Sequence, residues 1–118
     1  MTTLNERQLN TLRCIYEVDQ EQEQRQRRRS SGWWDNTPAS IWRQIWYKHE
    51  PKTGNHSMLY KMLKKNRLVD PGLGSTFKAL EERGFIKREY HNMVWDDVEL
   101  AIKITRSGRK LIRSIENN

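Results

Sequence analysis

Basic side chains are the most abundant groups in this sequence with a capacity for specific chemistry. The chain has 118 residues, with 22 lysines and arginines against 15 aspartates and glutamates, and a formal net charge of +7. Such a balance favours an anionic partner, which is either a nucleic acid or an anionic membrane surface. The same charge also suits a protein that is merely soluble, so the positions of the basic residues must decide between these interpretations.

Residues that commonly catalyse reactions or bind metals form no recognisable pattern. Cys14 is the single cysteine, which rules out an internal disulfide and a multi-cysteine metal site. His49, His56 and His91 lack the spacing of metal ligands. Residues 72–76, GLGST, are glycine-rich but lack the lysine of a phosphate-binding loop. We therefore expect no enzymatic activity, no metal and no cofactor.

Side chains suited to phosphates and base edges lie in four places along the chain. Arginine and lysine neutralise phosphates, serine contacts either phosphates or bases, and glycine allows a backbone to approach closely. Each group also has a plainer interpretation as a solvated surface. The candidates are Arg27, Arg28 and Arg29; Ser57, Lys61 and Lys64; Pro71, Gly72, Gly74, Ser75 and Lys78; and Arg88 and His91.

A first helix is predicted over residues 5–19. Asn5 suits the N-cap and Gln8 suits the reciprocal position of a capping box. Apolar residues then recur at helical spacing as far as Val18. Residues 20–36 are polar and rich in arginine, so they either prolong the helix into solvent or form a loop or arm.

A second helix is predicted from Thr37, with Pro38 at its first position. Four of the five tryptophans lie in and just before this helix, within residues 33–47. Aromatic clusters most often fill a core or a subunit interface, but they also stack nucleobases or anchor a partner. The predicted buried face consists of Ile41, Trp42, Ile45 and Trp46.

Two further helices are predicted within residues 57–84. Ser57 is suited to cap the first, and Asp70 with Pro71 is suited to begin the second. Gly84 is expected to end the second helix, as glycine does after a last helical turn. The inward-facing residues of the second helix are Leu73, Phe77 and Leu80.

A two-stranded ribbon and a last helix complete the predicted domain. Residues 85–104 alternate in polarity on both sides of a turn, and residues 105–116 form a helix capped by Thr105. A chain of this length forms one small domain. The expected fold class is therefore α+β, mainly helical with a small β-hairpin.

Two motifs give this order a resemblance to a known family. The stretch Leu80–Ile86, with a leucine, three charged residues, glycine and two apolar residues, resembles the end of a recognition helix in winged helix-turn-helix regulators. Leu100–Gly108 resembles the last strand and following helix of the same domains. The chain is thus similar to MarR- and PadR-like bacterial transcription regulators over about residues 57–113. Residues 20–56 have no counterpart in that family.

The resemblance implies that the helix beginning near Pro71 enters the major groove of double-stranded DNA. At about 100° per residue, its outer face carries Gly74, Ser75 and Lys78. We interpret Gly74 as the point where the backbone approaches DNA, and Gly72 as relieving crowding against the preceding helix. The resemblance also assigns the hairpin of residues 85–104 to the wing, although Asp96 and Asp97 near its tip would repel phosphates.

The leading functional hypothesis is a homodimeric, sequence-specific transcriptional regulator or repressor. One alternative is a winged-helix adaptor that binds proteins through residues 33–47, and another is a non-specific architectural DNA binder. No small-molecule effector is identifiable. The absence of a long apolar run and of a signal peptide predicts a cytoplasmic, nucleoid-associated protein without a membrane partner.

Overall fold

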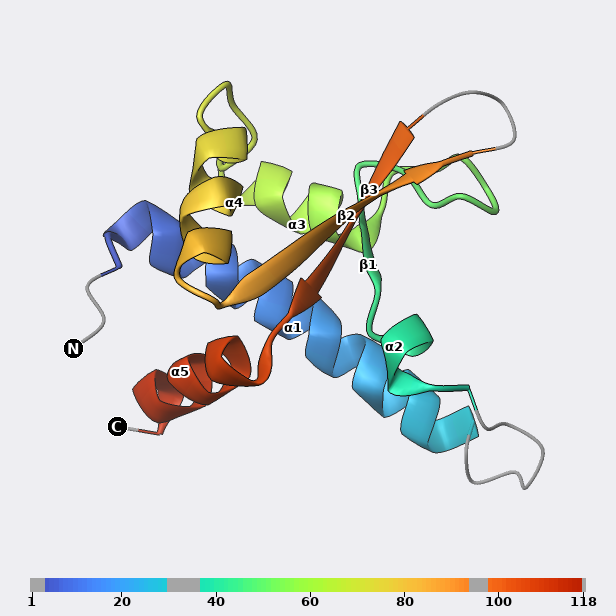
Figure 1. Ribbon diagram of the computed structural model, residues 1–118, viewed down its shortest axis with the longest axis horizontal. Helices are drawn as coiled ribbons and strands as arrows, with labels where there is room; N and C mark the ends of the chain where they lie inside the picture. The colour runs from blue at the N-terminus through green and yellow to red at the C-terminus, as the bar shows by residue number, and fades with distance from the viewer. Residues whose placement is uncertain (1–3, 30–36, 94–97, 118) are drawn as a thin grey trace.

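The part of the chain that the structure describes folds into five helices and one three-stranded sheet (Figure 1). The structure, a computed structural model, describes residues 4–29, 37–93 and 98–117. The elements are α1 (Glu6–Arg29), α2 (Ala39–Trp42), β1 (Ile45–Tyr47), α3 (Met58–Lys65), α4 (Leu73–Glu82), β2 (Ile86–Asn92), β3 (Val98–Ile104) and α5 (Arg106–Glu116). The predicted α+β class is confirmed. Two helices lie within residues 57–84, two paired strands follow within residues 85–104, and a last helix lies within residues 105–116.

Local capping groups begin three of the helices as expected. At α1 the Gln8 N–H donates to Asn5 Oδ1 at 2.7 Å, and the Asn5 N–H donates to Gln8 Oε1 at 3.1 Å. Ser57 accepts a hydrogen bond from the Tyr60 N–H at 3.1 Å and so caps α3. Thr105 caps α5 through the Gly108 N–H, also at 3.1 Å. Each cap satisfies a backbone donor that the helix leaves open.

The sheet is antiparallel with β3 in the centre, in the order β1-β3-β2. Ile45 pairs with Ile102, and Ile86 pairs with Ile104. These residues are buried and form the sheet's contribution to the core. The hairpin predicted over residues 85–104 is confirmed, but it has a third strand beside it that the sequence did not indicate.

The prediction of a long second helix is wrong. Helix α2 has four residues, no side-chain cap and no buried residue, and Ile41 is 58% exposed. Ile45 belongs instead to β1, where it is 1% exposed. Trp46 points to the other side of the sheet and meets the His91 ring edge-on, with 5.2 Å between centroids. Pairing with β3 satisfies the backbone of this segment and overrides its helical spacing.

Helix α1 continues through the polar stretch instead of ending near residue 19. The segment between α2 and β1 packs on this half of the helix. The Gln22 side-chain amide donates to the carbonyl oxygens of Trp42 and Gln44, at 2.7 and 3.0 Å. The Arg43 guanidinium donates to both oxygens of Asp19, at 2.7 and 2.9 Å. Asp19 is fully buried, so this pair fixes the second half of α1 to the domain.

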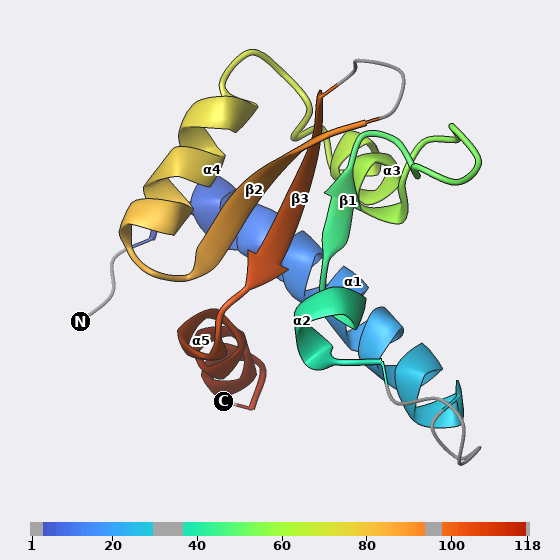
Figure 2. The same cartoon turned by 45° about the vertical axis from the view of Figure 1, so that its right-hand side comes forward.

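The core lies between α1 and the other elements. Helix α1 crosses behind the sheet and contacts α3, α4 and α5 (Figures 1 and 2). Its buried residues include Cys14, whose Sγ atom accepts a weak contact of 3.8 Å from the Asn66 side-chain amide. Fully buried apolar residues come from most of the elements: Leu12, Ile15, Leu59, Leu63, Leu80, Ile102 and Ile112.

A glycine-containing joint connects α4 to the sheet and to α5. Gly84 has a φ of 78°, and the N–H groups of Gly84 and Phe85 donate to the carbonyl oxygens of Glu81 and Leu80. This pattern ends helices at a left-handed residue, where glycine is favoured. The Thr105 hydroxyl then donates to the Gly84 carbonyl oxygen at 2.6 Å. The end of α4 and the start of α5 are therefore held together.

Candidate nucleic-acid interface

Helix α4 has one buried face and one open face, as the sequence predicts. Leu73, Thr76, Phe77 and Leu80 are buried against the core. Gly74, Ser75 and Lys78 are exposed on the opposite side. A helix held on one side by apolar contacts keeps a fixed orientation, so its open face is a rigid surface for a partner.

Gly74 leaves open space on this face. A Cβ atom built on Gly74 would meet no other atom within 4 Å. The side chain is therefore not missing because of crowding inside the protein, which agrees with our interpretation of close approach to an outside partner. Gly72 differs, because its Cβ would lie 3.3 Å from Asp70 Oδ1 and 3.8 Å from an Arg7 nitrogen. The crowding at Gly72 thus involves Asp70 and α1, and not the preceding helix as we expected.

Helix α4 begins two residues later than predicted. Its first residue is Leu73, and Pro71 and Gly72 form a turn before it. Asp70 still supports the turn, since its Oδ1 accepts from the Gly72 N–H at 2.8 Å. Pro71 and Gly72 remain exposed beside the start of the helix.

Arg7 fixes this start, and sequence reasoning missed it. Its guanidinium donates to both Asp70 oxygens at 2.6 and 2.8 Å, to the Leu68 carbonyl oxygen at 3.1 Å and to Thr76 Oγ1 at 3.0 Å. The hydrogen bonds from Arg7 hold the pKa of Asp70 below its usual range. Arg7 therefore positions α4 from α1. No local sequence signal reveals this, because Arg7 and Asp70 are 63 residues apart in sequence.

The candidates on and before α3 separate into two kinds. Lys61 and Lys64 are exposed, as a phosphate contact requires. Ser57 is 1% exposed and its hydroxyl oxygen caps α3, so its predicted contact with DNA does not fit the structure. Ser57 is a helix cap. Its hydroxyl is buried, so a phosphate outside the protein would not reach it.

Arg88 and His91 are engaged within the protein. The Glu81 carboxylate accepts from the Arg88 backbone N–H at 2.8 Å and from Nε and Nη2 at 3.2 and 3.0 Å, and the Arg88 side chain is 18% exposed. His91 packs on Trp46, with Nε2 3.4 Å from Glu89 Oε2. Arg88 thus connects β2 to α4, and its guanidinium is occupied within the protein, whereas the His91 side chain is still 34% exposed. Asp96 and Asp97 lie outside the described residues.

The arginine run is not brought beside α4. Arg27 and Arg28 are exposed on the last turns of α1, which lie at the lower right of Figure 1, whereas α4 is at the upper left. The Arg27 guanidinium lies 3.6 Å from Glu23 Oε1. The side chain of Arg29 lies outside the described residues.

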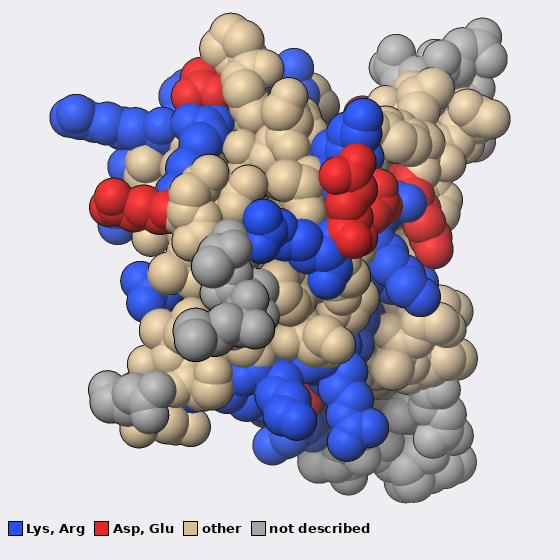
Figure 3. Space-filling view, turned by 60° about the vertical axis from the view of Figure 1, so that its left-hand side comes forward, with Lys and Arg blue, Asp and Glu red and all other residues tan. Residues whose placement is uncertain are grey.

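Positive charge gathers at α5 as well as near α4. Figure 3 shows lysine and arginine side chains in a group at the lower end of the face, where α5 lies. The residues of this group come from three segments that are distant in sequence, so no single motif predicts the group: Arg27, Arg43, Arg106, Arg109, Lys110 and Arg113.

None of the family models, curated proteins or solved structures compared with the chain matches it. Among the described residues no helix has the length and apolar character to cross a membrane. The same residues contain no group of three or more histidine, cysteine, aspartate or glutamate side chains placed to hold a metal ion.

Proposed function

We propose that this chain is a winged helix-turn-helix protein that binds double-stranded DNA through α4. The observation that carries the proposal is the open face of α4, where Gly74 faces empty space beside the exposed Ser75 and Lys78. A helix about 10–12 Å across fits the B-DNA major groove, which is about 12 Å wide. The sheet order β1-β3-β2 and the hairpin after α4 support the winged-helix assignment.

The expected role of each surface follows from its chemistry. Gly74 lets the α4 backbone approach DNA, Lys78 and Ser75 contact bases or phosphates, and Lys61 and Lys64 neutralise the backbone. Few of these groups discriminate between bases, so part of any specificity would come from the shape of the DNA. A homodimeric regulator is the biological form that we propose, on the strength of the family resemblance.

The test is selection from a pool of random duplex DNA at two salt concentrations, followed by sequencing of the retained molecules. We expect binding that weakens with salt, and an enriched, roughly palindromic motif, because a dimer reads two half-sites. Enrichment without a palindrome would contradict the dimer. Binding without enrichment would point to an architectural protein, and absence of binding at low salt would overturn the proposal.

The first variant to measure is Lys78→Ala. Loss of this side chain removes a base or phosphate contact, so we expect affinity for the selected duplex to fall by about 1–3 kcal/mol. Lys52→Ala is the matched control, since Lys52 is also exposed but lies in the loop between β1 and α3. Equal effects of the two substitutions on affinity would mean that net charge, and not the α4 face, governs binding.

An adaptor function is the second candidate. Ile41 is 58% exposed in the aromatic segment to which the adaptor alternative assigns the binding of a partner protein. The described tryptophans of that segment are half-buried, and Trp42 lies under the Arg43 guanidinium at 4.4 Å. Trp33 and Trp34 lie outside the described residues. A protein that bound no duplex DNA in the selection would direct attention to this segment.

A further inference from the structure

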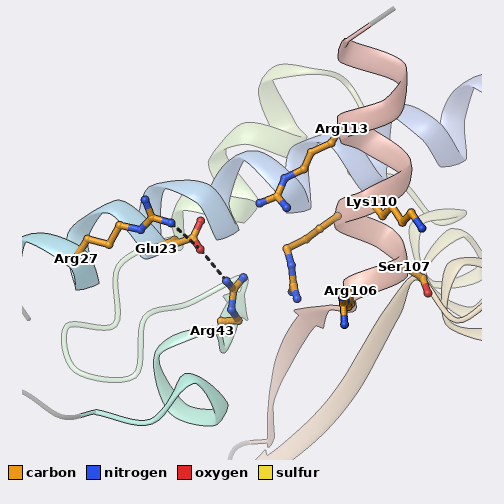
Figure 4. A pocket seen from close by; sticks show the side chains of 8 residues that line it. Glu23, Arg27, Arg43, Arg106, Ser107, Lys110 and Arg113 are labelled. Carbon is orange, nitrogen blue, oxygen red and sulfur yellow. Dashed lines mark hydrogen bonds and ion pairs between the residues drawn. The ribbon is translucent and has the colours of Figure 1, made fainter.

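A basic cleft lies between α5, the second half of α1 and the segment that joins α2 to β1 (Figure 4). It encloses about 700 Å³. Six of its eight lining residues are cationic, and the other two are Ser107 and Glu23. The cleft is therefore hollow, polar and strongly positive.

Among the described residues that line the cleft, six are cationic and one, Glu23, carries a carboxylate. Arg43 is occupied, because it donates to the buried Asp19 and, at 3.0 Å, to Glu23. Arg109 donates from one nitrogen to the Ile104 carbonyl oxygen, which is not a charged partner. These contacts orient the guanidinium groups of Arg43 and Arg109. The Glu23 carboxylate also lies 3.6 Å from Arg27, so Arg27 and Arg43 share it.

Helix α5 contributes three further cations to the lining: Arg106, Lys110 and Arg113. Figure 4 shows the Arg113 side chain pointing from α5 toward Arg43 and Glu23 on the other side. Arg113 uses its Nε atom in a 3.3 Å bond to the Tyr16 hydroxyl. The Arg106 side chain has no hydrogen bond or ion pair within residues 4–29, 37–93 and 98–117. The guanidinium groups of Arg109 and Arg113 thus lie beside a space whose lining, among the described residues, has one carboxylate, that of Glu23.

The electrostatics of the cleft favour an added anion. Burial and the nearby charge of Arg43 lower the pKa of Arg109 from its ordinary value. A lowered pKa means that the surroundings oppose the charged guanidinium. An anion in the cleft would relieve this repulsion and accept the unused guanidinium hydrogen bonds.

We infer that this cleft binds a small polyphosphate, a compact ligand with several phosphate groups, through Arg106, Arg109 and Arg113. The volume lies in the usual range for small-ligand sites, about 300–1,000 Å³. The lining contains no apolar residue, which suits a ligand recognised by charge. Helix α5 and the last turns of α1, which line the cleft, lie in the lower part of Figure 1, and the amino end of α4 lies at the top, so the inference does not depend on DNA binding by α4.

The probe is inorganic tripolyphosphate, titrated calorimetrically into the full chain at physiological salt. We expect saturable binding to one site and a higher melting temperature with ligand, because a ligand of the folded state stabilises it. Arg106→Gln with Arg113→Gln should weaken binding by at least about tenfold, since two charged hydrogen-bond donors are lost. Arg106→Gln alone should weaken it less, and this exposed substitution is not expected to disturb folding.

The matched control is Lys52→Gln with Lys65→Gln, which removes the same charge from two exposed lysines outside the cleft. Its affinity for tripolyphosphate should stay close to that of the parent. Equal weakening in both double variants, or no saturable binding by the parent up to about 1 mM, would overturn the inference. The inference would also be overturned if Arg106→Gln with Arg113→Gln lost duplex binding but bound tripolyphosphate as well as the parent. Failure of the selection with random DNA would leave this result untouched, so the two proposals fail separately.

Discussion

Gly74 and Gly108 lack side chains for opposite physical reasons. Gly74 lies in the first turn of α4 and faces open space. Gly108 lies in the first turn of α5 and is buried, and a Cβ atom there would collide with the Phe85 carbonyl oxygen and lie 2.8 Å from Ile104 Cγ1. One glycine thus keeps a surface accessible, and the other allows two elements to pack together.

Substitution at these two positions should separate function from stability. Gly74→Leu should leave the free energy of unfolding unchanged or raise it by up to about 1 kcal/mol, because leucine favours helix more than glycine does. It should weaken duplex binding by at least roughly tenfold by blocking close approach. Gly108→Ala should destabilise the fold by about 1–3 kcal/mol through overpacking. Urea unfolding and duplex titration measure the two effects.

The contrary results are equally specific. Unchanged duplex affinity in Gly74→Leu would mean that the α4 backbone does not approach DNA at this point. Unchanged unfolding of Gly108→Ala would mean that α5 shifts away from Phe85 at little cost.

Single residues were predictable from the sequence where their partners are close along the chain. The caps of α1, α3 and α5 each join residues three positions apart, and these caps are confirmed. Arg7 was not predictable as the residue that fixes α4, because its partners come from a loop and helix more than sixty positions away. Only the tertiary fold brings these groups together.

Between elements, Glu81 forms the polar connection from α4 to β2. Its hydrogen bonds with the Arg88 backbone N–H and side chain hold the pKa of Glu81 below that of an ordinary glutamate. A depressed folded-state pKa adds stability at pH values above the unfolded-state pKa. That stability is lost as the pH falls through the folded-state pKa.

Glu81→Gln should therefore lower stability at neutral pH and have little effect in acid. The urea midpoint of the parent should fall toward that of the variant below about pH 4, where glutamate becomes protonated. Glu82→Gln is the control, because Glu82 is exposed on the same helix. A difference between parent and Glu81→Gln that stayed constant from neutral to acid pH would show that charge on Glu81 does not secure α4.

Elements with strong local signals were predictable, and β1 was not. Residues 39–47 have apolar and aromatic side chains at helical spacing, so the pattern favoured a helix. Pairing with β3 decides the outcome, and a strand of three residues leaves little periodicity to recognise. The sequence also did not decide where α1 ends. The partners of Gln22 and Asp19, which hold the second half of this helix to the domain, lie in this same segment.

At the scale of the whole molecule, the fold creates a surface that no part of the sequence contains. The cationic residues of the basic cleft come from α1, from the segment after α2 and from α5. Their separation along the chain made each look like an ordinary solvated charge. The open face of α4, by contrast, was predictable in outline, because all its residues belong to one helix.

Because Cys14 is buried, the rate at which its thiol reacts measures how often the domain opens. Burial and the charge of Glu17 raise the pKa of Cys14 to about 11, and α1 is packed against most of the fold. At mildly alkaline pH, a thiol reagent should therefore modify the native protein slower than the urea-unfolded chain by a factor on the order of 10³ or more. The rate at which the reagent modifies Cys14 would then report how often α1 separates from its neighbours. Rapid modification of the native protein would instead mean that α1 opens locally while the rest of the domain stays folded.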